Sequence, residues 1–343
     1  MISALEPYLP ELWIGIIGFF LLYYAAADGV DLGVGMLTLL NPDAAERDTM
    51  MGALLSTWHS NQTWLLIVGG MMFGAFPLFY GLLLTALYIP VCAMLFGFII
   101  RGVALDYWAE ADRKEPWELA FGVGSLFTSV ALGFTLGGLL GGIHVENGNF
   151  AGGMLDWATP FGLCVTLGVI LGFVMLGANF LVLKMEGHLQ ELGFRYALIS
   201  TVLTLVASVS TYGLLFIRNP HLRERWTSVP GAYYRLAFPA LALLGFLALL
   251  ACLWRRYERA PLFLNVAIII CSFTGIALGL YPHLIPNVIG EAVTVAKAAA
   301  ASQTLSFMLI VVAVLLPIIL IYTSYEFWVF RGKVSEYYKK GEH

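Results

Sequence analysis

Long apolar runs dominate this sequence and leave few folds open to it. Hydrophobic residues make up 60% of the chain and charged residues only 12%, whereas roughly a quarter of the residues in a soluble domain are charged. A membrane-spanning helix needs about 20 mostly apolar residues. Runs of that length lie near residues 12–39, 51–76, 78–100, 119–142, 159–183, 196–217, 236–254, 262–280 and 304–330. We therefore predict an all-α polytopic membrane protein whose residues 1–343 form a single integral membrane domain with nine transmembrane helices. The helix count alone suggests two four-helix bundles plus one peripheral helix.

The basic residues predict how these helices are oriented. Lys and Arg favour the cytoplasmic side of a membrane, and nine spans place the two termini on opposite sides. With the N-terminus outside, 13 of the 18 Lys and Arg residues fall inside. The inside set is Arg47, Arg101, Arg113, Lys114, Lys184, Arg195, Arg255, Arg256, Arg259, Arg331, Lys333, Lys339 and Lys340. We therefore predict an external N-terminus and a cytoplasmic C-terminus. The first helix is expected to be retained, because no basic segment precedes it as in a cleavable signal.

The segment 218–235 departs from this charge distribution. It carries Arg218, Arg223, Arg225 and Arg235 on the predicted outer side, and it is either an anchor for a partner or a solvated linker. Two outer segments, 143–158 and 281–303, are long enough to carry structure, and neither resembles a soluble domain. The net charge of −4 argues against a nucleic acid partner.

Two carboxylates, Asp28 and Asp31, follow about fifteen apolar residues in the first run. A charge at the bilayer centre costs roughly 2.5–3.5 kcal/mol on insertion scales, so such residues usually face protein or water and mark function. Positions three apart share a helix face, so both side chains should project toward the same neighbour. Close carboxylates at low dielectric favour the neutral form of one of them. Gly29, Gly33 and Gly35 should allow another helix to approach closely. A solvated helix end near the interface is the alternative.

A second polar group, STWHSNQTW at 56–64, opens the second apolar run. It places the imidazole of His59 beside two amides and two indoles, contributed by Trp58, Asn61, Gln62 and Trp64. An imidazole suits proton exchange at neutral pH. Indoles and amides also populate membrane interfaces as passive anchors, and the stretch alone does not separate the two interpretations.

Other polar residues lie near predicted helix ends. Arg101 and Asp106 follow the third run and either pair around a frayed helix end or, for Arg101, simply obey the positive-inside rule. Lys184 and Glu186 should terminate the fifth helix, after the buried amide of Asn179. Glu326, in YTSYEFW, is either a deep carboxylate or an interfacial one.

The histidines argue against a haem or copper centre held by this chain alone. Such centres use imidazole ligands at membrane depth. His59 is the histidine expected inside, whereas the other five fall in predicted loops or the tail; they are His144, His188, His221, His283 and His343. The four cysteines show no CxxC spacing, and no dinucleotide-binding or P-loop fingerprint is present. The chain alone is therefore not expected to carry out electron transfer, hydride transfer or ATP hydrolysis.

Three motifs together resemble a known family. They are DGVDLGVGML at 28–37, WHSNQTWLLIVGG at 58–70 and FGAFPLFYGLLLTALYIP at 73–90. They resemble the second large subunit of the cytochrome bd-type quinol oxidases, and the resemblance extends over nearly the whole chain. It implies a haem-free subunit, not catalytic alone, in an electrogenic respiratory oxidase of the bacterial cytoplasmic membrane. The implied partner is a haem-bearing large subunit with haems b and d, which oxidises quinol and reduces oxygen to water.

The resemblance also implies roles for individual residues. Asp28 and Asp31 match the family's acidic pair, and Trp58, Asn61 and Trp64 match its second helix. Arg101 and Asp106 match the basic and acidic positions after the third helix. Several family members have an aspartate where this chain has His59, and an imidazole becomes cationic when it takes up a proton. The implied proton path from the cytoplasm contains Asp28, Asp31, His59 and Asp106, supported by Trp58, Asn61, Gln62, Trp64 and Arg101. Asp28 and Asp31 would contact the second helix and pass protons toward the partner.

Further partners and two other functions stay open at this point. The family implies small accessory subunits and bound membrane lipids or quinone in some members. The alternative function is a secondary transporter with a midplane acidic site at Asp28, Asp31 and His59, because transporters also contain midplane acids and glycine-interrupted helices. A third reading is a structural scaffold without a role in proton transfer.

Overall fold

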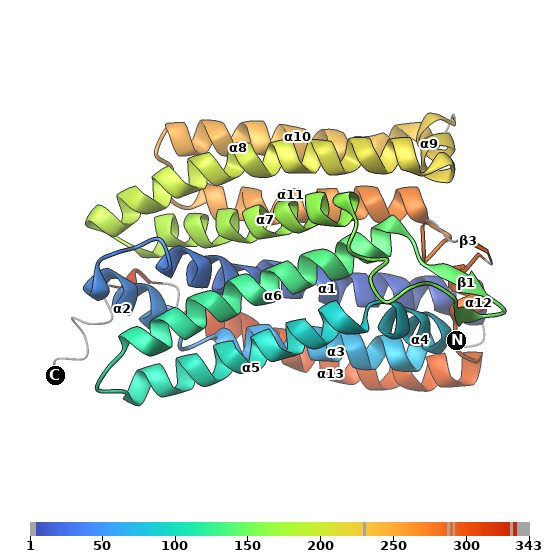
Figure 1. Cartoon of the computed structure of the whole chain (residues 1–343), viewed down its shortest axis with the longest axis horizontal. Coiled ribbons are helices and arrows are strands. Elements are labelled where there is room, and N and C mark those ends of the chain that lie inside the picture. The colour runs from blue at the N-terminus through green and yellow to red at the C-terminus, as the bar shows by residue number, and fades with distance from the viewer. Residues whose placement is uncertain (1–4, 229–230, 287–288, 291, 330–331, 335–343) are drawn as a thin grey trace.

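The computed structural model describes residues 5–228, 231–286, 289–290, 292–329 and 332–334 as a long bundle of helices (Figure 1). The elements are η2 (Glu6–Tyr8), α1 (Leu9–Thr38), α2 (Ala44–Gly52), α3 (Trp58–Ala75), α4 (Pro77–Ala86), α5 (Tyr88–Glu110), α6 (Glu115–Gly141), β1 (His144–Glu146), β2 (Asn149–Phe150), α7 (Pro160–Lys184), α8 (Gly187–Arg218), α9 (Pro220–Thr227), α10 (Ala232–Trp254), α11 (Ala260–Leu280), β3 (Ile289–Gly290), α12 (Val295–Ala298) and α13 (Ser302–Val329). The predicted all-α membrane class is confirmed.

Eight helices in the described part of the chain are long and apolar enough to cross a membrane: α1, α5, α6, α7, α8, α10, α11 and α13. Helix α3, which covers most of the predicted second span, is not among them. The predicted boundaries of α8 are too short, because the helix begins at Gly187 with a polar first turn that hydropathy does not mark. Nine spans therefore stay a prediction.

The predicted third span, 78–100, is wrong in its boundaries. It divides into α4, which begins at Pro77, and α5, which continues to Glu110. Pro77 has no N–H to donate and disfavours helical geometry in the residue before it, so α3 ends and α4 begins there. Arg101, which follows the predicted end of this span, lies inside α5.

The helices pack in a connected order. Helix α7 packs on α8, α8 on α10, α10 on α11, and α11 on α7, whereas α1 contacts α3 and α6, and α5 contacts α6. Helix α7 joins the two groups through its contacts with α1 and α6, and α13 packs against α3 and α1. The predicted division into two four-helix bundles and a peripheral helix stays a prediction.

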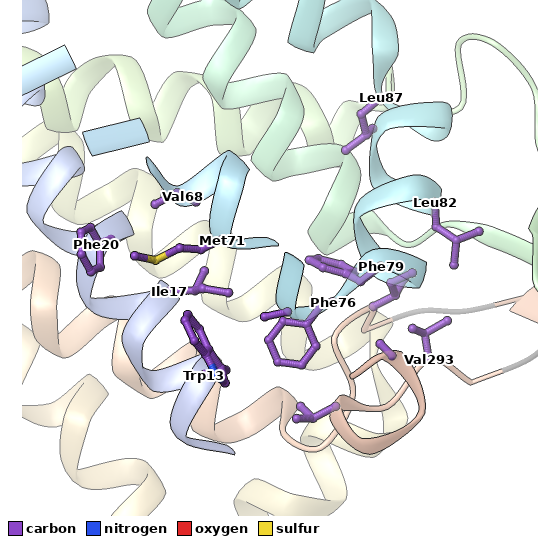
Figure 2. Packing of buried hydrophobic residues seen from close by; sticks show 14 of the residues in the cluster. Trp13, Ile17, Phe20, Val68, Met71, Phe76, Phe79, Leu82, Leu87 and Val293 are labelled. Carbon is purple, nitrogen blue, oxygen red and sulfur yellow. The ribbon is translucent and has the colours of Figure 1, made fainter. Parts of the chain in front are cut away.

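A large apolar cluster fixes α1 against α3 and α4 (Figure 2). Trp13, Ile17 and Phe20 of α1 face Val68 and Met71 of α3, and the cluster continues through Phe76, Phe79 and Leu82 to Leu87 and Val293. The indole N–H of Trp13 donates to the carbonyl of Leu305 at 3.1 Å, which ties α1 to the start of α13. This packing fixes α1 beside α3.

A small sheet at the other end of the bundle from α2 joins the two predicted outer segments (Figure 1). Strand β1 pairs antiparallel with β2 and parallel with β3. Residues 143–158 and 281–303 therefore do carry structure, and they share it.

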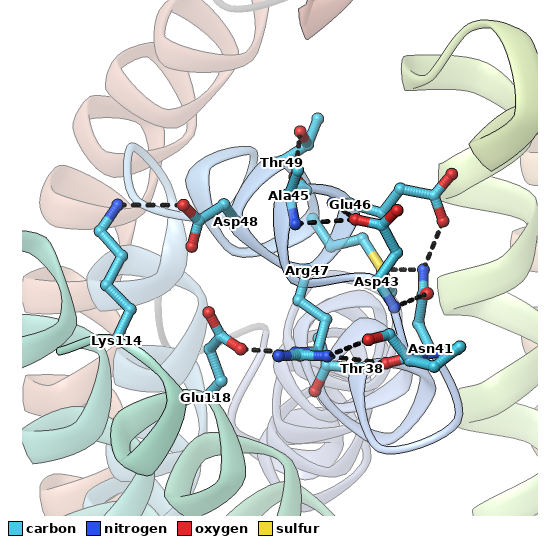
Figure 3. A network of polar contacts seen from close by, with 12 residues as sticks. Thr38, Asn41, Asp43, Ala45, Glu46, Arg47, Asp48, Thr49, Lys114 and Glu118 are labelled. Atoms are coloured by element: carbon cyan, nitrogen blue, oxygen red, sulfur yellow. Dashed lines mark hydrogen bonds and ion pairs between the residues drawn. The ribbon is translucent and has the colours of Figure 1, made fainter.

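Polar contacts gather at the end of the bundle that contains α2 (Figure 3). The Arg47 guanidinium contacts Glu118 of α6 and donates to the carbonyls of Asn41 and Pro42, while Lys114 donates to Asp48 at 3.3 Å. At the same end, Lys184 ends α7 as predicted and donates to the Gly332 carbonyl. Several segments that the charge distribution assigned to the cytoplasmic side thus lie together, although the orientation in the membrane stays a prediction.

Glycine allows α1 and α7 to touch through their backbones. A Cβ atom on Gly33 would meet the Phe173 carbonyl oxygen and would lie 2.7 Å from the Gly177 nitrogen. On the neighbouring face, a Cβ on Gly35 would collide with the Ser125 side chain of α6. The predicted close approach at Gly33 and Gly35 is confirmed, and the helices that approach are α7 and α6.

We expect Gly33→Ala to destabilise the protein, because the added methyl group would clash with backbone atoms of α7, which cannot move aside as a flexible side chain can. Overpacking of this kind costs about 1–3 kcal/mol. Thermal denaturation of the purified protein measures the effect. Gly15→Ala is the matched control on the same helix, since nothing lies within 4 Å of its added Cβ. Equal melting temperatures for the two variants would contradict the proposed backbone contact.

Candidate functional site

The centre of the site is an ion pair between α1 and α5. The two Arg101 Nη atoms donate to the two carboxylate oxygens of Asp28 at 2.8 and 3.1 Å. Asp28 is 0% and Arg101 2% exposed. The guanidinium also lies near the rings of Phe98 and Phe121, with centroids 5.9 and 5.8 Å away. A bidentate arginine–carboxylate pair is the geometry that best compensates two buried charges.

Asp31 lies one turn further along α1 and has a different neighbour. Its Oδ2 accepts a hydrogen bond from Asn61 Nδ2 of α3 at 2.9 Å, and the residue is 1% exposed. The expectation that both acids project toward one neighbour is wrong, since Asp28 reaches α5 and Asp31 reaches α3. The alternative of solvated acids at a helix end is also wrong, because both residues are buried inside α1. The predicted contact between the acidic pair and α3 is confirmed for Asp31.

Small residues let four helices meet at this site. The Trp58 ring of α3 lies 3.4 Å from a Cβ built on Gly102, next to Arg101 in α5. A Cβ on Gly124 of α6 would lie 3.1 Å from Arg101 Cγ. The polar side chains therefore sit where α1, α3, α5 and α6 are close enough to exclude bulk solvent.

Several buried polar atoms at this site have no hydrogen-bond partner among the described residues. They are Tyr24 Oη, Asn61 Oδ1, Arg101 Nε and Ser125 Oγ. An unpaired buried polar group costs about 1–3 kcal/mol, and internal water commonly compensates such groups. The site thus offers donors and acceptors beyond the two bonded pairs.

His59 and Asp106 lie at the surface of α3 and α5. His59 Nε2 is 3.9 Å from Asp106 Oδ1, and the two side chains are 71% and 58% exposed. His59 lies in the first turn of α3, with its side chain outward on the surface of this chain and its ring tilted against that of Trp58, centroids 3.6 Å apart. Its predicted place at membrane depth stays a prediction. The suggested pairing of Arg101 with Asp106 is wrong, since Arg101 turns inward to Asp28.

The remaining predicted residues flank these pairs. Trp58 and Trp64 are buried, and Gln62 is half-buried. The Trp64 ring packs against Tyr23 and Phe20 of α1, with centroids 4.2 and 5.3 Å apart. The two indoles therefore pack inside the helix bundle rather than anchoring the protein at a membrane interface.

Three contributors were absent from the predicted site. Tyr24 precedes Asp28 by four residues, so the i, i+4 rule could have placed it on the same face. Ser125 follows a glycine in a small-residue stretch of α6, and nothing local distinguishes it from packing residues. Glu326 of α13 accepts a hydrogen bond from Ser60 of α3 at 3.1 Å. Its carboxylate is half-buried and lies three residues before the helix ends at Val329, while its depth in the membrane stays a prediction.

The described histidines lie outside the helix interior. His59, His188 and His221 are exposed, and His144 and His283 are half-buried; His343 lies outside the described residues. A haem between helices needs a buried axial ligand. The described part of this chain places no imidazole in its buried interior.

We expect Arg101→Gln to destabilise the protein strongly, because it leaves the Asp28 carboxylate buried without a cation. Removal of one member of a buried pair costs about 3–5 kcal/mol. The double variant Asp28→Asn/Arg101→Gln removes both charges and should recover a large part of the loss. Thermal denaturation of the purified protein compares the two. If Arg101→Gln is as stable as Asp28→Asn/Arg101→Gln, the two charges do not compensate each other in the folded protein.

Comparisons with known proteins agree with this geometry. Residues 9–330 match the family described as cytochrome bd terminal oxidase subunit II. The chain is 25% identical to the cytochrome bd-I ubiquinol oxidase subunit 2 of Escherichia coli K12, with 95% of each chain covered. It is also 25% identical to the cytochrome bd ubiquinol oxidase subunit 2 of Bacillus subtilis, covering 95% of this chain and 97% of that one.

A solved structure shows the same fold. It is a chain of the bd oxidase from Geobacillus thermodenitrificans, with a TM-score of 0.76 and 19% identity. The alignment covers 94% of this chain and 99% of that one. The family match spans nearly all the described helices, including those that carry Asp28, Asp31, Asn61 and Arg101. The chain therefore belongs to the cytochrome bd terminal oxidase subunit II family.

Proposed function

We propose that this chain, as subunit II of a bacterial cytochrome bd quinol oxidase, stabilises the haem-bearing large subunit and provides part of the proton path to it. Family membership makes the chain a multi-pass subunit of a respiratory oxidoreductase with a large partner subunit. The haems b and d and the quinol site belong to that partner in our proposal. Reduction of oxygen to water consumes protons, which must reach the buried reaction centre from the cytoplasm.

The observation that supports a proton path is the contrast between the two buried acids. Asp28 is neutralised by two hydrogen bonds from the Arg101 cation, which fixes it as part of an ion pair. Asp31 receives a single neutral amide donor from Asn61 and has no cation bonded to it. Asp31 can therefore take up and release a proton without breaking an ion pair, while Asp28 and Arg101 hold α1 against α5.

The surface pair His59 and Asp106 provides a place for protons to arrive. Both side chains are exposed, and Trp58 links them spatially to the interior through its stacking on His59 and its contact with Gly102. The unpaired atoms of Tyr24, Asn61 and Ser125 can hold water between the bonded groups. Asn61, Gln62, Trp58, Trp64 and Arg101 act as supporting groups that orient or enclose the path.

His59 and Asp106 lie on a surface of α3 and α5 that is in contact with either lipid or another subunit. Two ionisable side chains on helix surfaces at membrane depth would be costly against lipid. We place the large subunit against this surface, so that His59 and Asp106 lie at the contact between subunits. Small accessory subunits, membrane lipid and quinone are further partners in this proposal.

We expect Asp31→Asn to lower the rate of oxygen reduction by at least about tenfold, equivalent to roughly 1.4 kcal/mol in the activation barrier. A carboxamide cannot take up and release a proton as a carboxyl group does. Assembly should persist, since Asn keeps the size of Asp and can bond to Asn61. Quinol-driven oxygen consumption, normalised to haem content, measures the effect. Asp31→Ala and Asp28→Ala should impair activity or assembly. Normal assembly and turnover in all three variants would overturn the proton path.

The secondary-transporter alternative is not favoured by the family match. Co-purification and absorption spectroscopy separate the two functions. We expect a tagged copy of this chain to co-purify with a large subunit that shows haem absorption bands. This chain purified alone should show no haem absorption. A stable lone protein that moves a solute across vesicles, with no haem-bearing partner, would support transport instead.

A further inference from the structure

Glu326 is a carboxylate that the proposed path does not use. It lies in α13, three residues before the helix ends at Val329, and it is half-buried. The Ser60 hydroxyl of α3 donates to its Oε2 at 3.1 Å. Among the described residues, no Lys or Arg forms an ion pair with Glu326. Its hydrogen-bond partner is thus a hydroxyl, a group that can both donate and accept a proton.

Ser60 connects Glu326 to the buried site. It precedes Asn61, whose Nδ2 holds Asp31 at 2.9 Å. Three helices therefore contribute in order, with a carboxylate from α13, a hydroxyl and an amide from α3, and a carboxylate from α1. Asn61 Oδ1 is buried and has no partner among the described residues, so it is free to accept a hydrogen bond from an internal water molecule.

The Ser60 hydroxyl has two acceptors within reach. Besides Glu326, it lies 2.8 Å from the Thr57 carbonyl oxygen in the turn before it. A single hydroxyl proton serves one acceptor at a time. When the proton points to Thr57, an oxygen lone pair is open to accept a proton from a protonated Glu326, which is the switch that a relay requires.

The surroundings of Glu326 suit a group that collects protons. Tyr23 of α1 lies within electrostatic range of it, Ser60 approaches from α3, and Tyr322 and Tyr325 lie on α13 itself. The first turn of α3 places the positive end of a helix dipole beside the carboxylate, which favours its ionised form and hence release of a proton to the relay. Because Ser60 and Glu326 both lie near the α2 end of their helices, they are on the cytoplasmic side in the predicted orientation.

We propose that Glu326 is a second proton-uptake group of this subunit, which delivers protons through Ser60 toward Asp31. The inference rests on the proposed function of Asp31 and adds a route on the α13 side of α3. It is independent of His59 and Asp106, which use the opposite contact between α3 and α5.

The test uses the intact purified oxidase with its partner subunit. Glu326→Gln keeps the length of the side chain and the oxygen that accepts from Ser60, but it removes the exchangeable proton. We expect at least a threefold loss of quinol-driven oxygen consumption at alkaline pH, where protons are scarce, and a smaller loss at acidic pH. Glu326→Asp should restore most of the rate. The matched control is Glu115→Gln, an exposed carboxylate in the first turn of α6, which should behave as the wild type.

A second variant tests the relay without touching the carboxylate. Ser60→Ala should reproduce the pH-dependent loss of Glu326→Gln, and the double variant should be no slower than either one, because both act on one route. All rates are normalised to haem content, so that a loss of assembly is not read as a loss of proton transfer. A purely structural role would instead lower the rate equally at all pH values and leave Glu326→Asp defective.

The outcomes separate this inference from the function on which it rests. If Asp31→Asn is impaired while Glu326→Gln and Ser60→Ala match Glu115→Gln at every pH, the uptake role of Glu326 is wrong and the Asp31 path stands. If Asp31→Asn turns over normally, both proposals fall together.

Discussion

The buried ion pair between Asp28 and Arg101 is the interaction on which the rest of the site depends. Two full charges are removed from solvent, and two hydrogen bonds from the Arg101 guanidinium to the Asp28 carboxylate compensate them. The bidentate geometry fixes how far α1 is shifted along α5 and how each helix is rotated about its own axis. Asp31 then lies one turn further along α1, where Asn61 reaches it from α3. Glycine backbone contacts with α7 and side-chain packing by Trp13 and Phe20 maintain that position of α1.

The site contains two kinds of carboxylate: one that is held ionised in a structural ion pair, and one whose protonation state can change. Asp28 belongs to the first kind, because protonating it would strand the Arg101 cation in the interior. Asp31 belongs to the second, since its bonded partner is an uncharged amide. The surrounding residues with unpaired polar atoms come from four helices, α1, α3, α5 and α6, so the proposed proton path can pass between helices without any of them shifting. In the proposed function, these carboxylates and unpaired polar atoms let a subunit without buried imidazoles among its described residues supply protons to a redox partner.

Local sequence patterns were sufficient for some features and insufficient for others. Apolar runs located α1 and α11 within a few residues, and the glycines near Asp31 correctly indicated close helix contacts. The partner of Asp28 is 73 residues away, and a pairing over that separation leaves no mark in the local sequence. The outward direction of the His59 side chain depends on the rotation of α3 against its neighbours, which hydropathy does not give. The strands of two or three residues in the small sheet have no sequence signal of their own.

That small sheet sets an order for completing the subunit. Strand β1 lies parallel to β3, which is contributed by a segment made after α11. Pairing between residues so far apart in the chain cannot begin until the later segment exists. During synthesis, the segment after α6 therefore waits with open backbone groups while five further helices, α7 to α11, are made. Closure of this end of the molecule thus reports that α7 to α11 have been made, while α12 and α13 still follow β3 in the chain.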